Sequence, residues 1–135
     1  MSYWILKTEP STYSFEDLLR DKKATWDGVS NLQALSYIRK MAKGDQVFIY
    51  HTGDSKSIVG LAEITSEAYP DPKLKDPKLV VVDLIPKQKV AREVSLAQVK
   101  AEPKFAELKL VRQSRLSVIP VPEAMWKLLL KMAGM

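Results

Sequence analysis

Tyr3-Trp4-Ile5-Leu6 is the stretch that most directly decides the fold, because four large apolar residues follow one another almost at the start of the chain. Because odd- and even-numbered positions are both apolar, the sequence predicts a strand that is buried on both faces and lies centrally in a sheet. Alternation puts Lys7 and Glu9 on one side of its continuation, and Pro10 holds Glu9 extended. These two charges at the open end of a buried strand either neutralise each other or serve a polar ligand as donor and acceptor.

Short helices are predicted to begin after four residues that suit a helix start, Ser14, Asn31, Ser95 and Pro122. Ser14 forms a capping box with Asp17 that uses the shorter acid. The helix after Asn31 has apolar residues at three-residue spacing and is expected to end at Lys43-Gly44, where lysine and glycine stand in the usual stop order.

Strands are predicted over residues 47–50, 58–69, 79–85, 90–94 and 116–121. The first two pair as a hairpin, with Gly60 as a bulge or a point of close approach, and Pro86 interrupts the third. Strands mixed with short helices, without βαβ alternation, predict an α+β domain around a small mixed or antiparallel barrel.

Size and composition predict one globular domain over residues 1–135, with 46% hydrophobic and 27% charged residues. The chain has no cysteine, which excludes disulfides, thiolate zinc sites and cysteine nucleophiles. Neither a basic leader nor an apolar stretch of bilayer-spanning length is present, so we expect a soluble, cytoplasmic protein without a membrane partner.

The formal net charge of +5 is unevenly distributed. Between Lys73 and Arg112 basic residues outnumber acidic ones two to one, whereas the rest of the chain is balanced. This excess is either an ordinary solvated surface or an electrostatic footprint for phosphates. In the second case the candidates for phosphate contact are Lys73, Lys75, Lys78 and Arg112.

The segment Trp26-Asp27-Gly28-Val29-Ser30-Asn31 sets an aromatic ring, a tight turn and a helix start side by side. Asp-Gly is a strong turn signal, and the helix start offers backbone N–H groups near the ring. Such a corner suits a flat polar ring with a nearby negative charge, as in a nucleotide. The alternative is that Trp26 fills the core and Asn31 only caps the helix.

Catalytic and cofactor motifs are lacking. No segment matches a phosphate-binding glycine loop, a dinucleotide fingerprint or a nucleophile elbow, and no metal-ligand spacing surrounds His51, the only histidine. We therefore expect no cofactor and no metal. His51 next to Tyr50 remains a candidate acid or base or, more often, a packing residue. Arg115 and Ser117 stand just before an apolar strand, where they suit either a phosphate or an internal contact.

The motifs occur in the order Tyr3-Trp4, Lys7, Glu9-Pro10, Tyr13-Ser14, Trp26-Asp27-Gly28-Val29, Asn31, Gly44-Asp45, Tyr50-His51, Gly60, Tyr69-Pro70-Asp71, Asp76-Pro77 and Arg115-Leu116-Ser117-Val118. Together they resemble the EVE domain, over nearly the whole chain. The resemblance implies a PUA-like mixed β pseudo-barrel with short peripheral helices, and a role in reading modified nucleotides, including modified cytosines in DNA.

Carried over position by position, the resemblance implies a cleft lined by Lys7, Glu9, Trp26, Val29, Ser30, Asn31, Tyr50, His51, Arg115 and Ser117. Two departures stand out. Position 30 is serine where the family usually has arginine, which removes a potential phosphate clamp. The stretch after Asp76-Pro77 is shorter than in many relatives, so we expect an abbreviated flap.

The leading hypothesis is a non-catalytic nucleic-acid-binding domain, for DNA or RNA, that takes a modified base into a pocket beside Trp26. One alternative is a small enzyme that acts on a nucleotide or RNA through His51, with Lys7 or Glu9 assisting. Another is a small-metabolite or protein-interaction module, which would not show salt-dependent binding of oligonucleotides.

Overall fold

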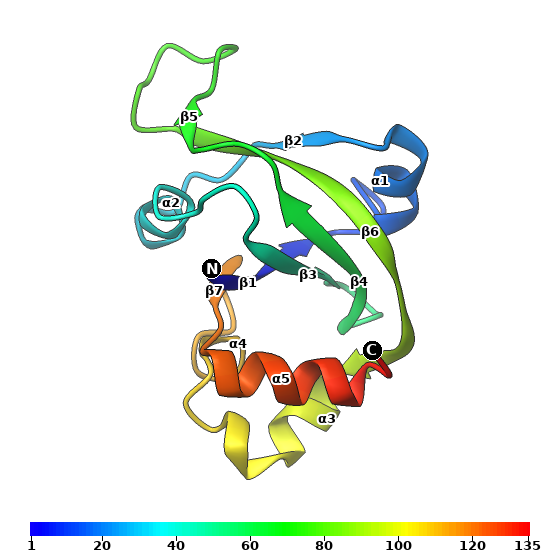
Figure 1. Cartoon of the computed structure of the whole chain (residues 1–135). Coiled ribbons are helices and arrows are strands. Elements are labelled where there is room, and N and C mark those ends of the chain that lie inside the picture. Colours follow the sequence, from blue (N-terminus) through cyan, green and yellow to red (C-terminus); the bar gives the residue numbers. More distant parts are fainter.

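A curled mixed sheet forms the centre of the computed structural model, which describes all of residues 1–135 (Figure 1). Its strands follow the order β2-β6-β4-β3-β1-β7, and β5 pairs with β6 outside this path. The bounds are β1 Tyr3–Thr8, β2 Ala24–Trp26, β3 Gln46–His51, β4 Ser57–Ile64, β5 Tyr69–Pro70, β6 Val80–Ser95 and β7 Val118–Pro120. Since β1 and β3 run parallel and the other pairs are antiparallel, the sheet is mixed.

Short helices surround this half-barrel, which confirms the expected α+β class and PUA-like pseudo-barrel. The helices are α1 Phe15–Asp21, α2 Leu32–Ile38, α3 Leu96–Ala101, the 3-10 turn η1 Pro103–Phe105, α4 Lys109–Arg112 and α5 Glu123–Met132. Helices α3, α4 and α5 gather at one end of the half-barrel, at the bottom of Figure 1, whereas α1 and α2 flank its upper part. None of these helices has the length and hydropathy that a membrane crossing requires.

Strand β1 is an interior strand that is buried on both faces, as its sequence predicts, and it lies next to the edge strand β7. It pairs with β3 from Tyr3 to Thr8 and with β7 on its other side, and Trp4, Ile5 and Leu6 are all buried. The Trp4 indole Nε1 donates to the buried carboxylate of Asp45 at 2.9 Å. This bond ties the strand to the turn before β3.

The predicted helix starts are confirmed, but the end of α2 is not. Ser14 and Ser95 form capping boxes, and the Asn31 side chain accepts from the Ala34 N–H at 2.9 Å. Helix α2 ends at Ile38 instead of Lys43-Gly44. After Ile38 the chain leaves the α-helical pattern, because the Lys40 and Met41 N–H groups donate to the Tyr37 and Ile38 carbonyls three residues back, and the Asp45 carboxylate accepts the next N–H, that of Ala42.

Two predicted strand boundaries also need correction. The strand expected over 58–69 ends at Ile64, and the chain pairs again only at β5. Pro86 does not interrupt its strand, because β6 runs through it from Val80 to Ser95. Pro86 lies opposite Ala62 at a register shift, where an irregular ladder tolerates the missing N–H.

Gly60 fulfils both roles proposed for it. The β4 register shifts beside it in both neighbouring strands, and the ring of Phe15 packs on its Cα so closely that a Cβ would overlap the ring carbons. This contact fixes α1 against the sheet next to the first helical turn.

Candidate functional site

A cavity of about 890 Å³ lies between the two edges of the half-barrel. One wall is the edge strand β2 and the turn that follows it, residues 23–31. The other wall is the end of β1 with residues 7–9, together with Ser117, which directly precedes the opposite edge strand β7. Residues 12–13, 21 and 73 complete the lining.

The structure brings most of the predicted pocket residues to this cavity. Its lining includes Lys7, Glu9, Trp26, Val29, Ser30, Asn31 and Ser117. They come from segments that are distant in the sequence and meet only because the sheet curls. The strand β2, which carries Trp26, was not predicted, because three residues are too few to show a period.

Trp26 is anchored as a wall of the cavity. Its side chain belongs to the hydrophobic core and is only 8% exposed, and its ring meets that of Tyr13 edge-on, with centroids 6.4 Å apart and planes at 80°. The indole is therefore not a free platform, since most of its surface packs inside the protein. What it offers to a ligand is a rigid apolar boundary.

Tyr13 is a cavity residue that the pocket prediction missed. Its hydroxyl donates to Asp21 Oδ2 at 2.9 Å, and burial followed by this hydrogen bond raises the pKa of Tyr13 to about 12. The hydrogen bonds from Arg20 and then Tyr13 lower the pKa of Asp21. The phenol thus stays protonated and held in place. The sequence signal for Tyr13 is the family motif Tyr13-Ser14, from which we assigned a role to Ser14, as a helix cap, and none to Tyr13.

Lys7 and Glu9 do not form an ion pair, although both line the cavity. The half-buried Lys7 Nζ donates to the Ser114 carbonyl at 3.0 Å and lies 5.7 Å from the centroid of the Tyr50 ring. Burial lowers the pKa of Lys7. An ammonium group has three donors, so two remain for a ligand.

Glu9 is held on the other side of the β1 end. Its carboxylate accepts from the Ser11 amide and hydroxyl at 3.3 and 3.1 Å and from Thr52 at 3.3 Å. The interpretation in which Lys7 and Glu9 neutralise each other is therefore wrong as a direct pairing. A cation and an anion are instead presented separately at the same opening.

The charge around the cavity is balanced. Lysines at positions 7, 23 and 73 face carboxylates at 9, 21 and 27. An evenly charged opening favours a ligand with donors and acceptors of its own over a bare anion.

Three residues predicted for the pocket do not line it, namely Tyr50, His51 and Arg115. Tyr50 is 3% exposed and buried under Lys7. The pocket prediction missed this because the end of a strand can face either the core or the opening. Arg115 is exposed and joins no ion pair.

His51 has a structural partner. Its Nε2 accepts a hydrogen bond from the Phe15 N–H, the first residue of α1, at 3.0 Å. The acceptor nitrogen carries no proton, so the ring is neutral with its proton on Nδ1. Burial lowers the pKa of His51, in opposition to the carboxylates of Glu93, Glu16 and Glu9. An acid–base role would have to break the bond that starts α1.

The predicted phosphate-contacting residues lie in two places. Lys73, Lys75 and Lys78 occupy the loop between β5 and β6, residues 71–79, and Lys73 reaches the cavity. Arg112 lies on α4, at the opposite end of the half-barrel from this loop, and its guanidinium is 3.9 Å from Glu107 (Figure 1). The basic residues between positions 73 and 112 therefore do not all lie on one surface, because β6 carries the chain from one end of the half-barrel to the other.

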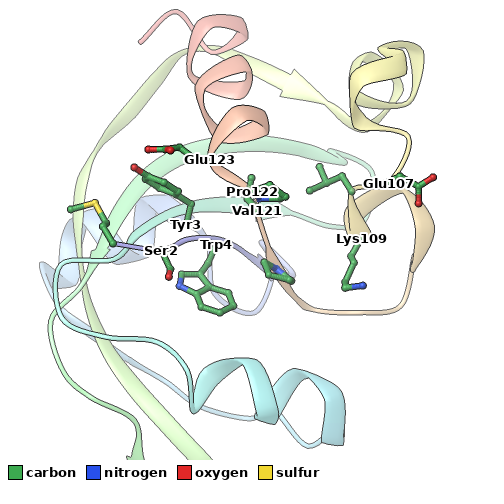
Figure 2. Close-up of a pocket in the computed structure, with 11 residues that line it drawn as sticks. Ser2, Tyr3, Trp4, Glu107, Lys109, Val121, Pro122 and Glu123 are labelled. Atoms are coloured by element: carbon green, nitrogen blue, oxygen red, sulfur yellow. The ribbon is translucent and has the colours of Figure 1, made fainter.

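A second cavity, of about 570 Å³, lies at the other ends of β1 and β7 (Figure 2). Tyr3 and Trp4 border it on one side and Val121, Pro122 and Glu123 on another, while Glu107 and Lys109 close it from the α4 side. It contains none of the predicted site residues. Since Asp45 engages the Trp4 indole N–H, that polar group is not available to a ligand there.

No group of three or more His, Asp or Glu side chains converges as a metal site would require. The first cavity offers an apolar wall at Trp26, lysine amines, hydroxyls and carboxylates.

A curled mixed sheet with short helices and a cavity between its edges defines a domain of the PUA-like class. A protein of Zymomonas mobilis described as an ASCH structure shares this fold, with a TM-score of 0.60 at 12% identity. The model of the EVE domain matches residues 2–132, and the chain belongs to this family.

Similar proteins come from bacteria and animals. Human thymocyte nuclear protein 1 is 34% identical over 126 residues, which cover 74% of this chain and 56% of that protein. A protein of Rhodopseudomonas palustris, solved by NMR, has a TM-score of 0.94 at 43% identity and covers 99% of this chain and 94% of its own. A crystal structure of human THYN1 in complex with 5-methylcytosine containing DNA has a TM-score of 0.91 at 28% identity, over 100% of this chain and 99% of that one.

The chain spans only part of its mammalian relatives, between 36% of the rat and mouse proteins and 56% of the human one.

Proposed function

We propose that this protein is a non-catalytic DNA-binding domain that takes a modified cytosine, extruded from the helix, into the cavity beside Trp26. The observation that carries the proposal is the structural match to human THYN1, which was crystallised with 5-methylcytosine containing DNA, along the full length of this chain. The cavity supports it, because its volume of about 890 Å³ lies within the range of ligand sites.

The lining offers partners for the ring, the exocyclic amine and the carbonyl of a cytosine. Trp26 and Val29 supply an apolar boundary for the ring and its 5-substituent. The exocyclic amine donates to a carboxylate such as Glu9 or Asp27, which is the usual pairing of acidic side chains with cytosine. The carbonyl accepts from the Lys7 amine or from the side-chain amide NH₂ of Asn31. The Asn31 side-chain oxygen is not available, because it already accepts from the Ala34 N–H.

The free energies of stacking and base extrusion show how much these polar contacts must contribute to the affinity. Stacking on an aromatic side chain is worth about 1–3 kcal/mol per base, whereas extrusion from a duplex costs a few kcal/mol. Since most of the indole is covered by core residues, Trp26 stands at the low end of that range. Hydrogen bonds to the base edge and contacts to phosphates must therefore provide most of the affinity and selectivity.

A reader role agrees better than catalysis with the state of His51. The only imidazole accepts the Phe15 N–H and does not line the cavity. Incubation of a modified oligonucleotide with the protein, followed by mass spectrometry of the nucleosides, is expected to return the substrate unchanged. Product formation that is lost in His51→Gln would establish the enzymatic alternative.

The binding experiment compares oligonucleotides that differ by one methyl group. Fluorescence anisotropy is measured with a DNA duplex that carries a single 5-methylcytosine, with the unmodified duplex, and with RNA of the same sequence with and without 5-methylcytosine. We expect tighter binding of the methylated DNA duplex, and loss of this preference in Trp26→Phe and Val29→Ala. Equal affinity of the wild-type protein for methylated and plain DNA would contradict the proposal, and a preference confined to RNA would transfer it to the other nucleic acid.

A further inference from the structure

Two large apolar side chains within the chain are strongly exposed, and both adjoin the cavity. Leu32 is 75% and Leu74 is 49% exposed, and the other large hydrophobic residues with such exposure are the terminal Met1 and Met135. Leu32 directly follows Asn31 and Leu74 directly follows Lys73, and both of these neighbours line the cavity. Each exposed leucine is thus the direct sequence neighbour of a residue that lines this cavity, and we call the two segments that carry them, the start of α2 and the loop of residues 71–79, the rim of the cavity.

Leu32 stands on a fixed support. It is the first residue of α2, whose next turn is buried through Ala34, Leu35 and Ile38. The Asn31 side chain accepts from the Ala34 N–H, and the Asn31 carbonyl accepts from the Leu35 N–H, each at 2.9 Å. The helix therefore cannot turn its first residue inward without breaking its cap and its packing against the core.

Leu74 is held in a loop that is connected to the same helix. The Leu74 N–H donates to the Asp71 carbonyl at 3.1 Å, and the Asp71 carboxylate, itself buried, accepts from the Lys73 N–H at 2.9 Å. At the end of the loop, the Arg39 guanidinium donates to the Lys78 carbonyl at 2.7 Å and so joins the loop to the residue that follows α2. The rim is therefore one connected structure with two apolar projections.

The loop that carries Leu74 has a small excess of positive charge, because its three lysines outnumber Asp71, whose carboxylate is buried, and Asp76. Lys73, Lys75 and Lys78 lie on its loop, and none of them forms an ion pair. An exposed leucine among free lysines suits a partner whose outer surface is anionic and whose interior is apolar. Double-helical nucleic acid has this combination, with phosphates outside and stacked bases inside.

We propose that Leu32 and Leu74 are wedges that enter the base stack of a DNA duplex on either side of the base lodged in the cavity. This inference rests on the proposed function and deepens it, because it names the side chains that hold the duplex open around the extruded base. Extrusion of a base leaves a gap between its neighbours. An apolar side chain that fills the gap removes both itself and the exposed base faces from water.

The test compares Leu32→Ala and Leu74→Ala with the control Met135→Ala, which removes an exposed apolar side chain at the C-terminus. Each protein is titrated with a duplex that carries one 5-methylcytosine and with the methylated strand alone. We expect at least one leucine variant to lose about tenfold in duplex affinity, as the burial of one leucine side chain implies. Single-strand affinity and the melting temperature of the protein should stay unchanged, and Leu32→Met should keep duplex binding.

A second readout reports the gap itself. 2-Aminopurine placed next to the methylated cytosine is quenched by stacking on a neighbouring base and brightens when that contact is lost. A leucine in the gap keeps the flanking bases apart, whereas an unfilled gap lets them stack on each other, so the leucine variants should give a dimmer complex than the wild type. Unchanged duplex affinity in both variants, or equal losses for duplex and single strand, would overturn the wedge while the reader function stands. Absence of any preference for methylated DNA in the wild-type protein would instead remove the proposed function.

Discussion

At Gly60 one hydrogen atom is all that fits between the β4 backbone and the ring of Phe15. This is a matter of space, since the backbone of Gly60 does not lie in the left-handed region. Because Phe15 starts α1 and its N–H donates to His51, the contact at Gly60 also sets the position of the segment that leads from Tyr13 into the helix.

We expect Gly60→Ala to lower the free energy of unfolding by about 1–3 kcal/mol, the usual cost of overpacking a core. Urea denaturation followed by tryptophan fluorescence measures the loss. The matched control is the pair Phe15→Leu and Phe15→Leu/Gly60→Ala, in which the smaller side chain makes room for the methyl group. If Gly60→Ala costs as much in the Phe15→Leu background, crowding by the ring is not the cause.

His51 makes the stability of the fold depend on pH. Its folded-state pKa is lowered by burial, whereas in the unfolded chain it has its ordinary value of about 6.5. The unfolded state therefore binds the proton more readily, and the contribution of neutral His51 is present above about pH 6.5 and lost as the pH falls through and below it. Protonation also removes the acceptor for the Phe15 N–H.

Urea midpoints measured between pH 5 and 7.5 should accordingly fall on acidification. In His51→Gln, whose side-chain carbonyl replaces the acceptor without titrating, this part of the pH dependence should disappear. Parallel curves for the wild type and the variant would assign the effect to carboxylates instead.

At the scale of elements, capping residues and hydrophobic periodicity predict most of the fold. Ser14, Asn31 and Ser95 begin helices as expected, because a cap acts within three residues of its own position. The segment that follows α2 is held by Asp45, seven residues beyond the last helical residue, which accepts the Ala42 N–H and the Trp4 indole N–H. Such a tertiary bond leaves no local pattern in the sequence.

In the candidate site, too, local features could be predicted from the sequence and contacts between distant segments could not. The corner from Trp26 to Asn31 is visible in the sequence because a turn signal and a cap are local. That Tyr13 meets Trp26 edge-on, and that Tyr50 is buried under Lys7, follow from how distant segments pack. Family resemblance supplied the grouping of Lys7, Trp26 and Ser117, which periodicity alone could not provide.

Asn31 allows capping and ligand contact to be separated within one element. Asn31→Ala should cost about 1 kcal/mol of stability through loss of the cap, and should also weaken binding. Asn31→Asp keeps the oxygen that accepts from the Ala34 N–H but lacks the amide NH₂ donor. Stability should therefore be retained while the affinity for methylated DNA falls. Thermal unfolding and anisotropy titrations on the same samples measure both effects. Full binding by Asn31→Asp would remove Asn31 from base recognition.

At the scale of the whole molecule, the division of basic residues predicts which surface meets phosphates. Lys73 and Lys75 lie on the loop at the cavity, whereas Arg112 lies at the other end of the half-barrel. Lys73→Gln/Lys75→Gln should weaken all duplexes to a similar extent, and the slope of log affinity against log salt should decrease by about 0.9 for each phosphate that the protein no longer neutralises.

Arg112→Gln is the matched control for this measurement, because it removes one cation far from the cavity. It should change neither the affinity nor the slope. A larger effect of Arg112→Gln than of the loop variant would place the phosphate surface at the α4 end.

The edge strand β2 and the end of β1, with Ser117 just before the edge strand β7, form opposite walls of one opening, and β2 has a hydrogen-bonded neighbour on one side only. A ligand bound in this cavity contacts both walls and so bridges the two sides of the open half-barrel. Occupancy should therefore slow deuterium uptake at the amides of Ala24–Trp26 and raise the melting temperature with ligand concentration, because the ligand adds its binding energy to the cohesion of the fold. Ligand binding and the stability of the half-barrel are then thermodynamically linked.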